Sequence, residues 1–496
     1  MISPLAKVTE LISTGRKIDE NYVYFIALLY CISTGEIGPV DLFKTAKDTK
    51  YGRYSTAFLD VTRLGIGWSY GLAASCELIA AKVSEKKEDP LKQLLVKLSQ
   101  VVRLGDDLKT FFRDELKNTI LTYEINYEKN LESQKLFMEM FYTLMSTSSF
   151  MIAANSIMSM MMGIGNAESM LLMSLAGSGG GMAMFVVMMY FMFPRDKLGY
   201  SDPISERKFR MKAYMAIGAS IGIGTILLIS NMVHPALAIG IAGIPLLYPG
   251  IIAKRMEGKL LARHEWYPSF ILHLGQLYAT VGSLGQALQA VLRSNFGPIH
   301  EFANGLRNRI KNRINQTIGF DLLSIECGSH IIANGNAIFS ISLEKGADMN
   351  ITGNIVADVT KKINELRGKR LQTASTFEMI ILILHVLSLA VFGLMNKLTE
   401  LFFGIINGEN VSESAFTLQT IDPGLMSAMM PILVIMTSII SGVAIKVVQG
   451  GLYKTLFYHV GLLTVLGGVA MFGITTIMAD FLEALVFDSI HLNNLG

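Results

Sequence analysis

Residues with types and spacing suited to chemistry are few in this chain. The glycine run at 177–181 could cradle a phosphate, but it lies inside an apolar stretch, whereas a phosphate loop follows a strand and faces water. No G-x-x-x-x-G-K-[ST] and no H-E-x-x-H sequence occurs, and residues 250–259 come nearest to the first without its ending. We therefore expect no enzyme activity, no catalytic or metal-binding residues and no cofactor, and we interpret the glycines as points of close helix packing.

Ionisable residues at membrane depth are also scarce. His385 is the only one well inside an apolar stretch, and Glu378 and His459 lie near the ends of theirs. A proton- or sodium-driven transporter normally carries several buried acids or bases that form a relay, so this function is only an alternative. The cysteines are too few and too scattered for a zinc site, and we expect them to be buried thiols: Cys31, Cys76 and Cys327.

Clusters of basic residues are the remaining candidates for function. Three clusters abut apolar stretches, where each Lys or Arg gains about 1 kcal/mol from anionic lipid headgroups. The residues expected at the membrane surface are Arg195, Lys197, Arg207, Lys208, Arg210, Lys212, Lys254, Arg255, Lys369 and Arg370.

A further basic cluster lies far from any apolar stretch and comprises Arg307, Arg309, Lys311 and Arg313. The spacing predicts that Arg309 and Arg313 share one face of a helix. A solvated face is one interpretation, and docking to an acidic protein surface is the other. We expect no binding of nucleic acid, because aromatic residues are not interleaved with these bases.

The elements that position these residues are membrane helices. Seven apolar stretches are long enough to cross a bilayer: 141–163, 170–193, 213–233, 236–253, 377–396, 425–445 and 457–479. With the N-terminus inside, 42 of the 43 Lys and Arg residues fall on the cytoplasmic side, and Lys397 is the exception. The sequence thus predicts a multi-pass protein of the cell membrane with a cytoplasmic N-terminus and an extracellular C-terminus.

Two segments are too polar to enter the membrane and show helical periodicity, for example at Leu91, Leu94, Leu95 and Leu98. The predicted fold is an all-α polytopic membrane protein with two helical cytoplasmic modules. Its parts are module 1 at 1–139, four spans in 140–253 with a basic cytoplasmic loop at 194–212, module 2 at 254–376, and three spans in 377–496.

The two modules resemble each other. Gly35 and Gly282 each follow an apolar helical stretch and precede an amphipathic one, and Gly105 and Gly346 each follow a later helical stretch. The two glycines of a module are separated by 70 residues in the first and 64 in the second. Two matches in the same order and at similar spacing favour an internal duplication.

These glycine-centred stretches and the topology resemble the type II secretion system F family, the membrane platform proteins of type IV pilus-like machines. Bacterial members usually carry two spans after the first module and one after the second. The four and three spans expected here are similar to the archaeal branch, particularly the platforms of archaella.

The resemblance implies a homo-oligomeric platform without enzyme activity of its own. It would dock a hexameric cytoplasmic secretion ATPase and feed prepilin or archaellin subunits from the membrane into a filament. Assembly and rotation of an archaellum is the expected function, and assembly of an archaeal adhesion pilus is the alternative within the same family.

Overall fold

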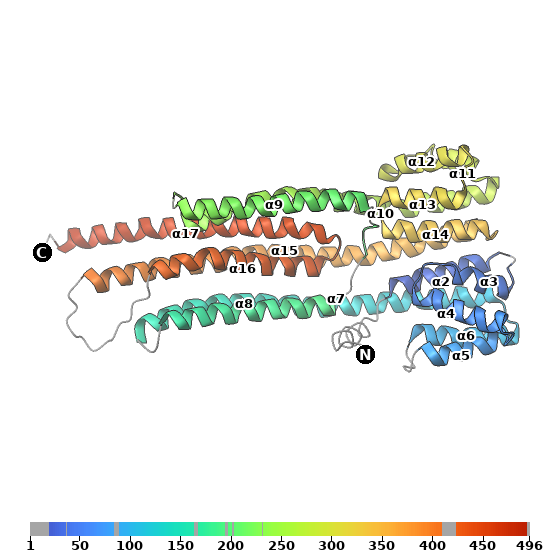
Figure 1. Cartoon of the computed structure of the whole chain (residues 1–496), viewed down its shortest axis with the longest axis horizontal. Helices are drawn as coiled ribbons and strands as arrows, with labels where there is room; N and C mark the ends of the chain where they lie inside the picture. Colours follow the sequence, from blue (N-terminus) through green and yellow to red (C-terminus); the bar gives the residue numbers. More distant parts are fainter. Residues whose placement is uncertain are drawn as a thin grey trace. The chain divides into compact units, whose positions relative to one another are not determined.

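The computed structural model describes residues 19–493 apart from 36, 84–88, 163–166, 194–196, 201–202, 231 and 409–422 (Figure 1). Within these residues the regular elements are helices, and a single isolated bridge joins Gly199 to Ser329. The predicted all-α fold is confirmed. Among the described helices, six are long and apolar enough to cross a membrane, which agrees with a multi-pass membrane protein.

The chain forms two compact units. Unit 1 is drawn from Met1–Lys129, Lys197–Asp202 and Gly258–Gly368, and unit 2 from Asn130–Asp196, Pro203–Glu257 and Lys369–Gly496. The predicted module limits at 139, 254 and 376 fall inside three continuous helices: α7 (Leu108–Met162), α10 (Pro235–Val281) and α15 (Met349–Gly408). Each of these helices contains residues of both units.

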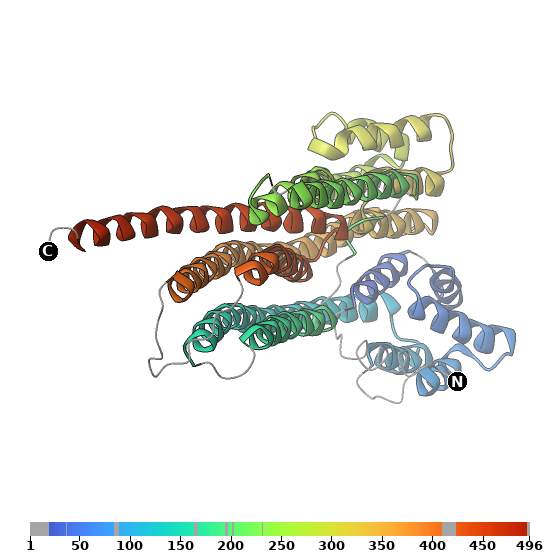
Figure 2. The same ribbon diagram turned by 60° about the vertical axis from the view of Figure 1, so that its left-hand side comes forward.

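Unit 1 contains two successive sets of helices in the same order (Figure 2). The first set is α2 (Glu20–Ser33), α3 (Pro39–Lys47), α4 (Arg53–Thr62), α5 (Leu72–Val83), α6 (Pro90–Leu104) and the start of α7. The second set is the end of α10, then α11 (Leu284–Val291), α12 (His300–Lys311), α13 (Gln316–Cys327), α14 (His330–Glu344) and the start of α15. We call these sets the first and second repeat. The helices α5 and α13 both have 12 residues, and α6 and α14 both have 15, which agrees with a duplication.

The corner before the last helix is built alike in both repeats. Gly105 ends α6 with φ 74°, and Gly346 follows α14 with φ 68°, a left-handed conformation that glycine adopts without strain. Asp107 then accepts the backbone N–H of Thr110, and Asp348 accepts those of the first turn of α15. These carboxylates satisfy N–H groups that have no partner inside the helix.

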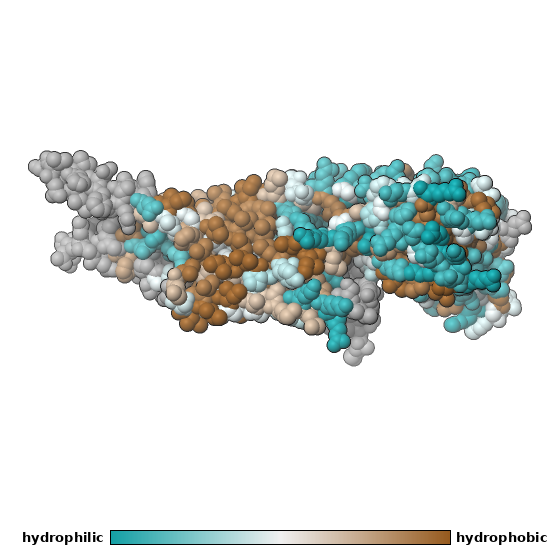
Figure 3. Space-filling view, turned by 90° about the horizontal axis from the view of Figure 1, so that it is seen from above, coloured by the Kyte–Doolittle hydropathy of each residue, from teal (hydrophilic) through white to brown (hydrophobic). Residues whose placement is uncertain are grey.

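Unit 2 contains the apolar parts of α7, α10 and α15 together with α8 (Ala167–Met192), α9 (Pro203–Ser230), α16 (Pro423–Gln449) and α17 (Leu456–Asn493). Large apolar side chains such as Met184, Ile229 and Met379 are exposed on it. Figure 3 shows apolar surface gathered on one part of the molecule and polar surface on another. Exposed apolar side chains on membrane-length helices are suited to contact with lipid.

The first of the seven predicted spans, 141–163, does not meet the same criterion of length and hydropathy. It is helical up to Met162, as part of α7, but its Ser and Thr residues and Asn155 make it less apolar than the other six. Its residue 163 lies outside the described residues. Phe141 and Met145 are nevertheless buried in unit 2 with Met182 and Phe377, so this part of α7 is a member of the bundle.

Candidate functional site

The motif glycines gather at the end of unit 1 where α7 and α15 begin. Gly105 and Gly346 each lie three residues before the first residue of these two helices. Gly35 packs on Gly346, since a Cβ on Gly35 would lie 3.2 Å from the Gly346 carbonyl oxygen. Beside this contact, the backbone N–H of Asp348 donates to the Thr34 hydroxyl at 3.0 Å. We call this region the glycine end of unit 1.

The fourth glycine, Gly282, lies at the same end. The helix α10 runs antiparallel to α15, because Asn364 donates to the His264 carbonyl while Gly275 packs on Gly353 further along. A Cβ on Gly275 would lie 2.8 Å from the Cα of Gly353, so the two backbones approach closely. The end of α10, with Gly282 directly after it, therefore lies where α15 starts.

The predicted docking cluster also belongs to the glycine end. The helices α13 and α14 are antiparallel, because Gly328 and Ser329 alone join them and Asn336 donates to Ser324 at 2.9 Å. Since α14 ends beside Gly346, α13 begins at the glycine end, and so does the α12–α13 connection at 312–315. This connection carries Arg313, and Lys311 directly precedes it as the last residue of α12.

The prediction that Arg309 and Arg313 share a helix face is wrong. The helix α12 ends at Lys311, and Arg313 has φ 60°, a left-handed conformation outside the helix. The backbone N–H of Ile314 donates back to the Arg309 carbonyl, which closes the helix. Arg309 is paired with Glu326, whereas Lys311 and Arg313 are exposed and Arg307 is half-buried.

The equivalent connection of the first repeat was missed by sequence reasoning. Between α4 and α5 the chain forms the π-helix η1 (Arg63–Gly67), and Ser69 follows with φ 61°. Trp68 is 67% exposed and Tyr70 is 58% exposed. Arg103 near the end of α6 pairs with Glu77 in the middle of the antiparallel α5, so the start of α5 and this connection lie at the glycine end as well.

The glycine end therefore presents two different kinds of side chain from equivalent positions of the repeats. The first repeat offers the aromatic residues Trp68 and Tyr70, and the second offers the cations Lys311 and Arg313. Trp, Tyr and Arg are the residue types that dominate binding energy at protein interfaces. We call these four residues the docking surface. A sequence signal for it was present, because W-S-Y-G between two helices is unusually apolar for an exposed turn.

The two repeats are tied together inside unit 1 by ion pairs that the sequence could not reveal. Arg367 of α15 donates to Glu20 of α2 at 2.7 Å, and the two side chains are only 5% and 15% exposed. Lys362 of α15 donates to Glu124 of α7 at 2.6 Å. A protein is strongly destabilised when a buried pair loses one partner, so the Arg367–Glu20 pair fixes the repeats against each other.

Most residues predicted at the membrane surface are exposed, but not all. Arg195 lies outside the described residues. The segment that contains Lys197 is held by unit 1, because Leu198 accepts from the His330 backbone and Tyr200 donates to Gly328. Lys254 lies over the ring of Tyr458 at 4.0 Å. The exposed residues are Lys197, Arg207, Lys208, Arg210, Lys212, Lys254, Arg255 and Lys369.

The prediction that Arg370 lies at the membrane surface is corrected, because its side chain is buried within the protein. Its side chain is 1% exposed, and the guanidinium donates to the Val448 carbonyl at 2.9 Å and the Val447 carbonyl at 3.1 Å. The last carbonyls of a helix have no partner within the helix, and a buried arginine satisfies them at the end of α16. Charge near an apolar stretch does not distinguish this role from lipid binding.

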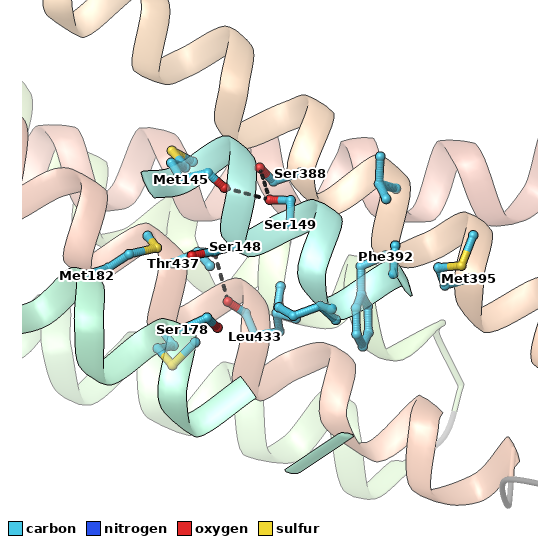
Figure 4. A pocket seen from close by; sticks show the side chains of 14 residues that line it. Met145, Ser148, Ser149, Ser178, Met182, Ser388, Phe392, Met395, Leu433 and Thr437 are labelled. Atoms are coloured by element: carbon cyan, nitrogen blue, oxygen red, sulfur yellow. Dashed lines mark hydrogen bonds between the residues drawn. The ribbon is translucent and has the colours of Figure 1, made fainter. Parts of the chain in front are cut away.

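A small pocket of about 30 Å³ lies in unit 2 between α7, α8, α15 and α16 (Figure 4). Methionine and hydroxyl side chains line it, and Ser149 donates to Ser388 at 2.7 Å. The lining holds no charged residue. Nε2 of the buried His385 lies 3.1 Å from the Leu463 carbonyl oxygen and 3.3 Å from the Ser438 hydroxyl, which are contacts of the kind expected for a structural histidine.

The cysteines are buried, as predicted, and burial raises the pKa of the thiols of Cys31, Cys76 and Cys327 to about 12. Within the described part of the chain, no group of three or more His, Cys, Asp or Glu side chains could hold a metal ion.

Two curated proteins are similar to this chain over most of its length. Flagella accessory protein J of Methanococcus voltae is 22% identical over 472 residues, which cover 91% of this chain and 83% of that protein. Flagella accessory protein J of Methanocaldococcus jannaschii is 21% identical over 485 residues, which cover 92% and 84%. No protein-family model and no solved structure matches the chain. The similarity confirms the predicted resemblance to archaellum proteins, while the assignment of a type II secretion F domain stays a prediction.

Proposed function

We propose that this archaellum-related membrane platform protein binds a hexameric cytoplasmic ATPase through the docking surface of unit 1. The observation that carries the proposal is the meeting of two repeats at one end, where the first repeat exposes Trp68 and Tyr70 and the second repeat exposes the cations Lys311 and Arg313 on another flank of unit 1 (Figure 1). Solvent-exposed aromatic residues in a strained turn are costly for a domain that has no partner. An apolar pocket on the ATPase would cover Trp68 and Tyr70, and a separate acidic surface would pair with Lys311 and Arg313.

The orientation of the chain supports this partner. Placing unit 1 in the cytoplasm keeps 42 of 43 Lys and Arg residues on the side that retains positive charge. The ATPase then meets unit 1, and the C-terminus lies outside the cell. Exposed basic residues of α9 and Lys254 and Lys369 would rest at the anionic headgroups of the cytoplasmic leaflet.

The chain would act as a transmitter of movement and not as an enzyme. The helices α7, α10 and α15 contain residues of both units, so a displacement in unit 1 moves their apolar parts as well. Packed helices with discrete arrangements can carry such coupling. In this proposal the movement admits prepilin-like or archaellin subunits, apolar helix first, into the filament, and several copies of the chain surround its base.

The test is binding of the purified ATPase to membranes that contain the full chain. We expect Lys311→Glu with Arg313→Glu to weaken binding by about tenfold and to reduce its dependence on salt. Trp68→Ala with Tyr70→Ala should weaken it by a similar or larger factor, because central aromatic residues carry interface energy. Lys361→Glu is the matched control, since Lys361 is exposed on α15 of unit 1, away from the glycine end. Binding and filament assembly that survive both double substitutions would overturn the proposal.

A further inference from the structure

The turn between α16 and α17 is held by side chains from other helices of unit 2. Gly450 and Gly451 form it with φ 68° and 71°, and the short helix Tyr453–Thr455 follows. Arg370 of α15 donates to the carbonyls of Val447 and Val448 in the last turn of α16. A Cβ on Gly450 would lie 2.9 Å from the guanidinium carbon of Arg370, so only glycine leaves room for this side chain.

A second side chain reaches the turn from α10. Glu257 accepts the backbone N–H of Leu452 at 3.4 Å, and its other carboxylate oxygen is 3.9 Å from the Lys446 ammonium. A Cβ on Gly451 would lie 1.9 Å from the Glu257 carboxylate, closer than any two such atoms can approach. The side chains of Glu257 and Lys446 are only 14% and 11% exposed, so water replaces few of these contacts when they break.

A third contact fixes the ends of the two helices that the turn joins. Glu378 of α15 accepts the Gln449 amide at 2.7 Å, and its other oxygen is 3.2 Å from Nδ1 of His459. The second ring nitrogen of His459 is 3.0 Å from the Gln449 side-chain oxygen. The end of α16 and the start of α17 are thus bound to the same carboxylate.

Arg370 and Glu257 lie at the limit of unit 2 along their helices, and this position links the α16–α17 turn to α10 and α15. Glu257 is the last residue of unit 2 along α10, and Arg370 is the second residue of unit 2 along α15. Each is attached to one of the helices that also contain residues of unit 1. A shift or rotation of α10 or α15 would therefore pull directly on the α16–α17 turn.

We propose that Arg370 and Glu257 form a latch on the α16–α17 turn, and that α10 and α15 open and close this latch when they move. When the latch is closed, α16 and α17 are held at a fixed spacing. When it opens, the glycine pair lets the turn change conformation and the two helices separate. The latch itself follows from unit 2 alone, whereas the source of the movement rests on the proposed function.

The first experiment measures hydrogen exchange of the backbone N–H groups at 450–456 in the purified full chain. Arg370→Gln and Glu257→Ala should accelerate exchange there by about tenfold, because they remove the side chains that hold the turn. Lys369→Gln and Glu265→Ala are matched controls on the same helices, since both residues are exposed. Arg370→Lys keeps the charge without the two-carbonyl fork and should give an intermediate rate even if Arg370→Gln does not fold. Unchanged exchange in Arg370→Lys and Glu257→Ala would overturn the latch.

The second experiment adds the hexameric ATPase, with ADP or with a non-hydrolysable ATP analogue, to the full chain in lipid. We expect exchange at 450–456 to differ between the two nucleotides by about tenfold in the unaltered chain and to be fast in both for Arg370→Gln. An ATPase that binds without any nucleotide-dependent change would overturn the coupling and leave the docking proposal standing. An ATPase that fails to bind the unaltered chain would overturn docking and coupling, while the first experiment still decides the latch.

Discussion

Gly35 of the first repeat lies against Gly346 of the second, with 3.2 Å between the position of a Gly35 Cβ and the Gly346 carbonyl oxygen. The three atoms nearest to a Cβ at position 35 are backbone atoms of residues 345–347, which cannot change rotamer as a flexible side chain can. This contact makes the glycine end a junction of the two repeats.

The junction predicts a graded loss of stability. Gly35→Ala should lower the free energy of unfolding by about 1 kcal/mol, and Gly35→Leu by about 3 kcal/mol, because the added atoms force the backbones apart. Thermal unfolding of the purified chain in detergent measures the difference. Gly38→Ala is the matched control, because nothing lies within 4 Å of a Cβ there. Equal behaviour of Gly35→Leu and Gly38→Ala would contradict the junction.

The buried ion pair between Arg367 and Glu20 predicts a large cost of removing one partner. Arg367→Met should destabilise the chain by about 3 kcal/mol, since the Glu20 carboxylate loses its charge partner in a buried site. Arg113→Met removes a surface pair with Asp114 and should cost less than about 1 kcal/mol. Denaturant or thermal unfolding monitored by circular dichroism gives both values. A cost for Arg367→Met as small as that for Arg113→Met would show that the pair does not join the repeats.

His330 predicts a loss of stability in acid. Burial, with the nearby charges of Arg367 and Lys197, lowers its pKa to about 4, and the neutral ring accepts from the Asn334 amide at 3.2 Å. His330 is protonated near pH 6.5 in the unfolded chain and only near pH 4 in the folded chain. The stabilisation of the folded state by neutral His330 is therefore complete above pH 6.5. It is lost as the pH falls from 6.5 to 4, by up to about 3 kcal/mol.

His330→Gln removes this titration and should reduce the slope of the pH dependence of thermal unfolding between pH 6.5 and 4, while the buried His264, whose pKa burial lowers to about 3, still contributes to that slope. His300→Gln is a control at a histidine of α12 in the same unit. An unaltered pH profile in His330→Gln would contradict the assigned pKa.

Because the three thiols are buried, we predict that they react slowly with maleimide in the folded chain. With a pKa of about 12, Cys31, Cys76 and Cys327 carry almost no thiolate at pH 8, and each is buried. The folded chain should therefore react with maleimide far more slowly than the denatured chain, in which all three react. Mass spectrometry of the labelled protein counts the adducts, and fast labelling of any of the three in the folded chain would contradict the packing around it.

Hydropathy and glycine spacing predicted the helical class, the apolar helices and the repeat, because these features leave periodic signals in a local stretch of sequence. The limits of the modules were harder to predict from the sequence. Nothing in the sequence near residues 139 or 376 stops a helix, since no proline interrupts α7 or α15, and the units are divided by packing instead.

The roles of individual charges were the least predictable. Arg370 has the same type and neighbours as a lipid-binding arginine, and only the fold shows that it ends α16. Arg309 and Arg367 have partners 17 and 347 residues away, which no local pattern encodes. Trp68 and Tyr70 could have been noticed as apolar residues in a turn, but their exposure depends on η1 and on Ser69.

The most direct test of the platform function is the side of the membrane on which unit 1 lies. Lys311→Cys and Glu400→Cys place exposed thiols on unit 1 and near the end of α15, and the native thiols are buried and add little background. With a membrane-impermeant maleimide on intact cells, we predict labelling of Glu400→Cys alone, and labelling of Lys311→Cys only after the membrane is opened. Labelling of Lys311→Cys in intact cells would place unit 1 outside, beyond the reach of any cytoplasmic ATPase, and would contradict the account.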